Sequence, residues 1–80
     1  MKEETKWELK GFIEASKYRK LVLKALNEKE KTPTELAKEL NLKLSHISRT
    51  LKELQEKKLV ECLNPNARKS RYYKSNKIVI

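Results

Sequence analysis

The sequence predicts a mainly α-helical domain that carries one small β-hairpin, an α+β fold. Apolar residues recur at helical spacing over most of residues 7–57. A strong helix start, Thr32-Pro33-Thr34-Glu35, stands inside that stretch. From Leu59 onward, two short strand-like runs flank the turn residues Asn64-Pro65-Asn66. With 80 residues, the chain has room for one domain with a small core.

Residues 7–28 are expected to be helical and to carry two different apolar stripes. The first stripe lies on one side of a helical wheel, and the second, from Tyr18 to Leu26, lies on nearly the opposite side. Either one helix shows both faces, or the helix breaks near Ser16, which is a good N-cap. We expect residues 16–80 to form the folded domain, with the second stripe in its core.

Residues 1–15 are then a helical segment outside that domain and a candidate dimerisation element. The candidate interface consists of the first apolar stripe, Leu9, Phe12 and Ile13, together with Trp7. The alternative is that Trp7 and Phe12 fold back onto their own domain.

Residues 32–57 predict a helix-turn-helix. Thr32 and Glu35 form a capping box, and the helix should end near Asn41, which tolerates a left-handed backbone. After a turn at Leu42-Lys43, a second helix is expected over 44–57. Its buried stripe is predicted to be Leu44, Ile47, Leu51 and Leu54. Two helices joined by so short a turn form this motif.

Residues 59–75 predict a β-hairpin with a basic tip, the sequence form of a wing. The strands are expected over Leu59–Leu63 and Arg71–Ser75, joined by a loop that begins at Asn64. Cys62 alternates with apolar residues on the first strand, so we expect it to be a small core residue.

The charge is concentrated in the second half of the chain. There are 20 Lys and Arg against 11 acidic residues, a net charge of +9. Residues 1–40 hold 10 basic and 8 acidic residues, a net +2, whereas residues 41–80 hold 10 and 3, a net +7. This asymmetry suits a polyanionic partner, either nucleic acid or an anionic membrane. A generally Lys/Glu-rich surface would explain the first half but not the second.

The outward face of the second helix of the pair is expected to read DNA. Arg49 lies opposite the predicted buried stripe, and short polar or basic residues flank it. Arginine pairs bidentately with guanine, and serine or histidine can reach base edges or phosphates. The wing supplies a second basic set for phosphate or the minor groove. The candidate DNA-binding residues are Lys43, Ser45, His46, Ser48, Arg49, Lys52, Arg68, Lys69, Arg71 and Lys74.

Two ordinary explanations compete with this one: a solvated helix face, on which Glu53 and Glu56 also lie, and a surface loop whose charges serve solubility.

Catalytic and metal-binding functions find no support in the sequence. The single cysteine excludes an intramolecular disulfide, and with only one histidine beside it we expect no zinc site within one chain; no cofactor motif is present. His46 has Thr50 at its i+4 position, which supports neither a metal site nor a general base. The sequence has no nucleophile with a base at workable spacing, no carboxylate pair in an apolar setting and no glycine-rich phosphate loop, so we expect a protein that is not an enzyme. Without a visible secretory signal or apolar membrane span, the expected location is the cytoplasm.

Three segments resemble archaeal winged-helix transcription regulators, which are similar to the ArsR and MarR families: Thr32–Leu40, Leu44–Leu54 and Leu59–Pro65. With Ser16–Arg19 and Arg71–Tyr73, the resemblance extends over residues 7–75. It implies a winged helix-turn-helix with a three-helix core, and a dimer formed by helices outside that core. It also places Ser45, His46, Ser48, Arg49 and Lys52 on the recognition helix and Arg68, Lys69 and Arg71 on the wing.

The sequence departs from this family pattern in three ways. Lys58 and Ser70 stand where glycine is often found, so both turns are expected to have a different shape. The family's C-terminal helix has no counterpart before Ile78-Val79-Ile80, so dimerisation should depend on the N-terminal segment or on this apolar tail. The cysteine cluster of metal-sensing members is absent.

The sequence leaves three functions to compare. The leading one is a sequence-specific regulator that binds double-stranded DNA as a homodimer. The second is a nonspecific architectural or RNA binder, for which Tyr72 and Tyr73 offer stacking surfaces. The third is a protein-interaction module, which should carry an apolar anchor on its outward helix face.

Overall fold

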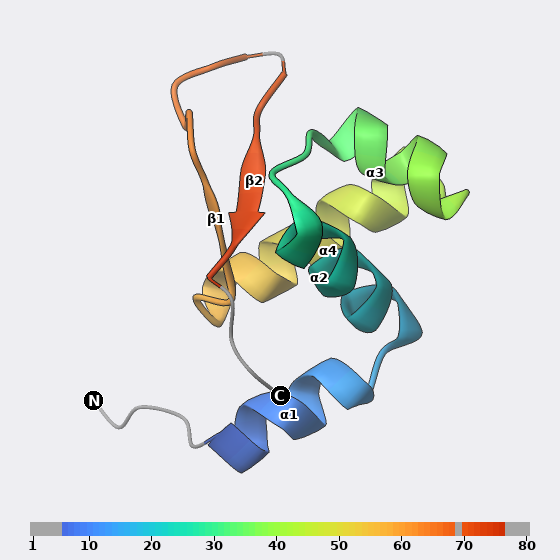
Figure 1. Cartoon of the computed structure of the whole chain (residues 1–80), viewed down its shortest axis with the longest axis vertical. Coiled ribbons are helices and arrows are strands. Elements are labelled where there is room, and N and C mark those ends of the chain that lie inside the picture. Colours follow the sequence, from blue (N-terminus) through green and yellow to red (C-terminus); the bar gives the residue numbers. More distant parts are fainter. Residues whose placement is uncertain (1–5, 69, 77–80) are drawn as a thin grey trace.

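The computed structural model describes residues 6–68 and 70–76, and within them it has four helices and a two-stranded antiparallel sheet (Figure 1). The α+β prediction is therefore confirmed. No helix among the described residues has the length and apolarity that crossing a membrane requires. The elements are α1 Lys6–Glu14, α2 Lys17–Glu28, α3 Pro33–Leu40, α4 Leu44–Glu56, β1 Val60–Cys62 and β2 Tyr73–Ser75.

The helical stretch breaks at Ser16, as one of the two alternatives predicted. Ser16 is the N-cap of α2, with an extended backbone, and its hydroxyl oxygen accepts the N–H of Arg19 at 3.4 Å. This cap satisfies a donor that the first turn of α2 would otherwise leave unpaired. The chain turns at this cap, so α1 and α2 are separate helices that pack against each other.

The prediction for Ile13 is wrong. This side chain is 2% exposed and belongs to the same core as Val22 and Leu26, so it is not available to a dimer partner. Leu9 and Phe12 are half-buried against that core. The break at Ser16 explains the correction, because it lets the first apolar stripe turn inward although it is out of phase with the second. Of the four residues proposed for the dimer interface, Trp7 remains largely exposed, at 80%.

The helix-turn-helix has the predicted caps. Thr32 and Glu35 form the capping box at the start of α3, and Pro33 occupies its first turn. Asn41 ends the helix in the left-handed conformation, with φ 55° and ψ 47°, and its N–H donates to the carbonyl of Ala37. Leu42 and Lys43 then lead into α4.

The buried side of α4 differs from the prediction at one position. Ile47, Leu51 and Leu54 are buried as expected, but Leu44 is 50% exposed and Thr50, at 3%, takes its place. The centre of the buried side thus moves by about 30° around the helix. Leu44 is the first helical residue, and a helical side chain leans towards the N-terminal end of its helix. It therefore extends past the edge of the core.

The hairpin has shorter strands than predicted and gains a third segment. β1 and β2 pair with Val60 opposite Ser75 and Cys62 opposite Tyr73. On the other side of β2, Lys31 and Tyr73 exchange backbone hydrogen bonds of 3.0 and 2.9 Å. The segment before α3 is thus joined to the sheet, which fixes the helix-turn-helix relative to the wing.

A buried lysine strengthens this junction. The side chain of Lys31 is 7% exposed, and its ammonium group donates to the carbonyl of Ala25 at 2.9 Å. It also forms an ion pair with Glu39 of α3 at 3.0 Å. These partners satisfy a charge that would otherwise be costly to bury. Lys31 therefore links α2, the sheet and α3.

Both non-glycine turns adopt backbone angles that glycine favours. Lys58 has φ 60° and Ser70 has φ 54°. Lys58 and Ser70 therefore hold a left-handed backbone that glycine adopts without strain and that a residue with a side chain adopts at a cost.

Candidate nucleic-acid interface

The exposed side of α4 carries hydroxyl and basic groups. Ser45, Ser48, Arg49 and Lys52 are all exposed, as predicted, and so is Lys43 at the N-cap. Because the buried side is rotated, Ser45 lies nearest the centre of the exposed face. Lys52 and Arg49 lie about 30° to either side of that centre, and Ser48 lies farther out. These side chains can donate hydrogen bonds to base edges or phosphates.

His46 lies apart from this face. Its side chain is half-buried, and its ring stacks on Tyr18 of α2, with centroids 5.1 Å apart and planes 26° from parallel. The rotation of α4 accounts for this position, since it moves His46 to the edge of the helix that faces α2. The structure therefore gives the ring a packing contact between helices and does not place it with Ser45 and Lys52.

Glu53, which sequence reasoning placed on the outward face, has a partner on α2. Its carboxylate accepts from the guanidinium of Arg19, and the closer distance is 3.3 Å. This pair neutralises an acidic group that would otherwise repel a polyanion beside Arg49 and Lys52.

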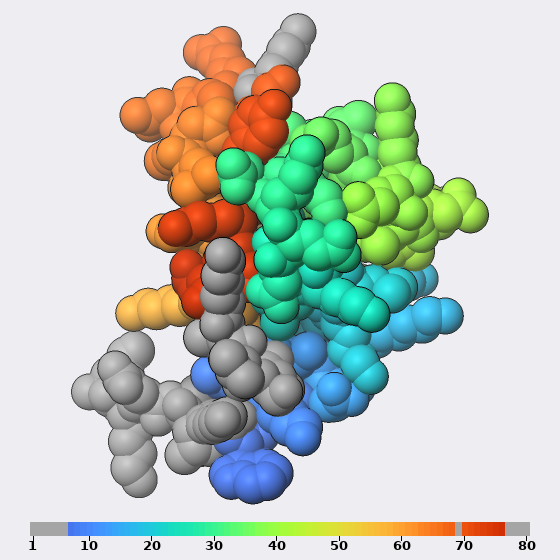
Figure 2. Space-filling model, viewed as in Figure 1, coloured from blue at the N-terminus to red at the C-terminus, as the bar shows by residue number. Residues whose placement is uncertain are grey.

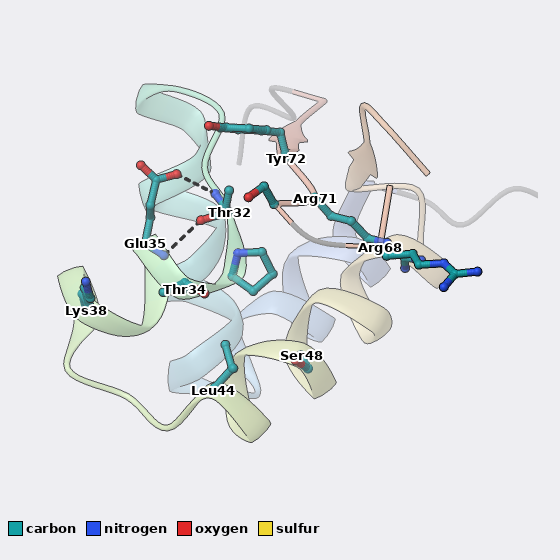
Figure 3. A pocket seen from close by; sticks show the side chains of 11 residues that line it. Thr32, Thr34, Glu35, Lys38, Leu44, Ser48, Arg68, Arg71 and Tyr72 are labelled. Atoms are coloured by element: carbon teal, nitrogen blue, oxygen red, sulfur yellow. Dashed lines mark hydrogen bonds between the residues drawn. The ribbon is translucent and has the colours of Figure 1, made fainter. Parts of the chain in front are cut away.

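An open hollow of about 700 Å³ lies between the start of α3, the start of α4 and the wing (Figure 3). Side chains of α3, α4 and the wing thus share one concave surface, as the figure shows. Its lining includes Thr34 and Lys38 from α3, Leu44 and Ser48 from α4, and Arg68, Arg71 and Tyr72 from the wing. The sequence did not predict the α3 residues of this hollow or the apolar contributions of Leu44 and Tyr72, because no periodic pattern marks a surface that three elements share.

Glu35 is the acidic group of this hollow. Its carboxylate accepts the N–H of Thr32 at 2.9 Å, and Thr32 accepts the N–H of Glu35 at 3.2 Å. The backbone hydrogen bond from Thr32 lowers the pKa of Glu35 below its usual value. The hollow thus has a negative charge beside Lys38 and positive charges at the wing.

The wing loop is held in shape by Asn64. Its Oδ1 accepts the N–H of Tyr72 at 2.7 Å, and its Nδ2 donates to the carbonyl of Ser70 at 3.1 Å. Across the same loop, Nε of Arg71 donates to the carbonyl of Ala67 at 2.6 Å. Part of the Arg71 guanidinium is thus used within the wing.

Two other predicted wing residues are placed differently. Arg68 is exposed on the loop and lines the hollow, whereas Lys69 lies outside the described residues. Lys74 sits on β2 and pairs across the strands with Glu61 at 3.2 Å, and it is not part of the hollow's lining. Figure 2 shows the wing at the opposite end of the molecule from α1.

Cys62 is half-buried, and its sulfur lies 3.9 Å from Oδ1 of Asn64. Across residues 6–68 and 70–76, no three His, Cys, Asp or Glu side chains gather in a group that could hold a metal ion.

The sequence of residues 19–78, three quarters of the chain, matches the family model described as winged helix-turn helix. No curated protein and no solved structure matches the chain.

Proposed function

Since the chain belongs to the winged helix-turn-helix family, we propose that it binds double-stranded DNA sequence-specifically and regulates transcription, without enzymatic activity. The proposal extends to a cytoplasmic regulator of the archaeal type that resembles the ArsR and MarR families. In this arrangement α4 enters the major groove, and the wing contacts the backbone or the minor groove.

The observation that carries the proposal is that the exposed basic surfaces of α4 and of the wing border the same hollow. Ser48 of α4 and Arg68 of the wing line the same concavity, while Arg49 and Lys52 continue along the helix. A groove-reading helix needs a neighbouring element that fixes its register on the phosphates, and the wing is in that position.

We propose further that the protein acts as a homodimer through α1. Trp7 is exposed on α1, at the end of the molecule opposite the wing tip (Figure 1). A partner bound there would leave the hollow free for DNA. Two copies would then present two recognition helices to a two-fold symmetric site.

The test is fluorescence anisotropy of a labelled random duplex over a salt series, with a single-stranded competitor. Each neutralised phosphate contributes about −0.9 to the log–log slope, so a slope of roughly −4 or steeper is expected. Arg68→Ala should weaken binding to all DNA sequences equally and make the log–log salt slope less steep by about one. Lys74→Ala is the matched control, because Lys74 pairs with Glu61 away from the hollow, and it should change neither quantity.

Base preference is tested with Arg49→Ala. On a duplex selected from a random pool, this variant should lose most of its preference over random DNA while its salt slope changes by about one at most. Absence of duplex binding at low salt contradicts the proposal, and tighter binding of the single strand favours a nonspecific or RNA-binding role.

A protein-interaction module is the second candidate, and one observation favours it. Leu44 and Tyr72 are 50% and 41% exposed, and both line the hollow. Apolar groups in a concavity can anchor a protein partner. The basic surroundings of these two side chains favour nucleic acid over such a partner, and the anisotropy experiment separates the two.

A further inference from the structure

Leu44 is an apolar side chain in a polar setting, at the N-terminal end of α4. It is 50% exposed, whereas the other leucines of α4, Leu51 and Leu54, are 2% and 0% exposed. Leaving a leucine half in water forgoes part of the favourable free energy of its burial. Its position is therefore better suited to a surface that becomes covered when a partner binds.

The surroundings of Leu44 indicate what covers it. Lys43 precedes it, Ser48 follows it one turn later, and Arg68 lines the same hollow from the wing (Figure 3). The hollow is lined by three basic side chains, Lys38, Arg68 and Arg71, against one acidic side chain, Glu35. This excess of positive charge matches a polyanion rather than an apolar protein surface. The partner must therefore combine negative charge with an apolar group that a leucine can contact.

The major groove of DNA offers this combination at one kind of base. Phosphates line the groove, and among the four bases only thymine presents a methyl group on its floor. In helix-turn-helix proteins, the N-terminal residues of the recognition helix are those that meet base edges. Leu44 is the first residue of α4.

We propose that Leu44 is a specificity-determining residue that contacts the 5-methyl group of a thymine. This inference rests on the proposed function, because it requires α4 to enter the major groove. Leu44 and Arg49 are five residues apart and so roughly 140° apart around the helix. They therefore face different base pairs, and a thymine contact by Leu44 adds to a guanine contact by Arg49.

The experiment removes the methyl group alone. A duplex is first selected from a random pool with the wild-type protein, and each thymine in it is then replaced singly by deoxyuridine. At one or two positions, replacing thymine by deoxyuridine should weaken wild-type binding about fourfold. This is the change in affinity expected for the loss of one buried methyl group. Leu44→Ala should bind thymine and deoxyuridine duplexes equally at those positions, with an unchanged salt slope.

Leu63→Ala is the matched control, because Leu63 is a leucine of similar exposure, 47%, that does not line the hollow. This variant should discriminate thymine from deoxyuridine as the wild type does. If the selected duplex binds but no deoxyuridine substitution matters, or if Leu44→Ala still discriminates, the thymine contact is refuted and the proposed function stands. If no duplex binds at all, both are refuted.

Discussion

Arg19 of α2 forms a two-point ion pair with Glu53 of α4, with Nε to Oε1 at 3.3 Å and Nη2 to Oε2 at 3.4 Å. Its third nitrogen, Nη1, donates to the carbonyl of Phe12 at 2.8 Å, and the guanidinium lies 3.9 Å from the centre of the Phe12 ring. One side chain thus joins α1, α2 and the helix proposed to read DNA. The planar fork of arginine allows these contacts at once, which lysine could not provide.

This relationship predicts a measurable coupling between Arg19 and Glu53. In a double-mutant cycle with Arg19→Met and Glu53→Gln, followed by urea unfolding, we expect a coupling free energy of about 0.5–1 kcal/mol. The side chains are 18% and 32% exposed, so the coupling should fall at high salt.

The pair Lys20–Glu14 is the matched control for this cycle. Its distance is 2.9 Å, but its side chains are 51% and 47% exposed, so its coupling should be close to zero. Equal couplings for the two pairs would show that Arg19 does not organise the three helices.

The backbone at Lys58 predicts a stabilising substitution. Lys58 N–H donates to the carbonyl of Gln55 at 2.9 Å, and Leu59 N–H donates to that of Leu54 at 3.0 Å. This is the hydrogen-bond pattern of an α-helix that ends at a residue with left-handed backbone angles. Lys58→Gly relieves the strain of φ 60° but gives the unfolded chain more freedom. We expect the free energy of unfolding to rise by about 0.5–1 kcal/mol.

Thermal unfolding checks this expectation, with a rise in Tm of about 2–6 °C. Gln55→Gly is the control: its residue is exposed within α4, in ordinary helical geometry, and the substitution should lower the stability by about 1 kcal/mol. A destabilised Lys58→Gly variant would mean that the lysine side chain contributes more than its backbone costs.

Local signals in the sequence predicted the helix boundaries well, and side-chain phase less well. The caps at Ser16, Thr32 and Asn41 depend on a few adjacent residues, which the sequence displays directly. The exposure of Leu44 depends on where the core ends beyond the helix, and helical periodicity contains no such information. Lys31 was missed for a similar reason, since one bridging residue between a helix and a sheet leaves no repeating pattern.

The same limit applied to the candidate site. Helical periodicity predicts that the basic and hydroxyl residues of α4 share its exposed face, so most of that face was predicted. His46 was predicted on that face and Lys74 among the DNA-binding residues of the wing, but His46 stacks on Tyr18 of α2 and Lys74 pairs with Glu61 of β1. Only the packed structure brings them together.

The capping box predicts how stability varies at acid pH. The pKa of Glu35 is lowered chiefly by the hydrogen bond from the Thr32 backbone, so the folded state favours the carboxylate. This contribution is fully present above the unfolded pKa and is lost as the pH falls through the lower, folded pKa. Gln at this position also accepts the hydrogen bond but does not titrate.

Urea unfolding of the wild type and of Glu35→Gln from pH 7 to pH 3 tests this prediction. The stability difference between them should be constant down to about pH 5 and should shift against the wild type below about pH 4.5. A difference that stays constant to pH 3 would show that the hydrogen bond from Thr32 does not depend on the charge of Glu35.

Trp7 provides both the test and the reporter for the proposed dimer. It is the one tryptophan of the chain, and its side chain is 80% exposed in the single copy. If α1 pairs with a second copy, burial of this ring should shift its fluorescence emission to shorter wavelength as the protein concentration rises. Sedimentation equilibrium should show a dimer for the wild type and a monomer for Trp7→Ala, because an exposed aromatic ring is a typical interface anchor. Leu63→Ala, on the hairpin away from α1, should leave the dimer intact. A wild-type protein that stays monomeric with an unshifted emission, both free and on a selected duplex, would exclude α1 as the dimer contact.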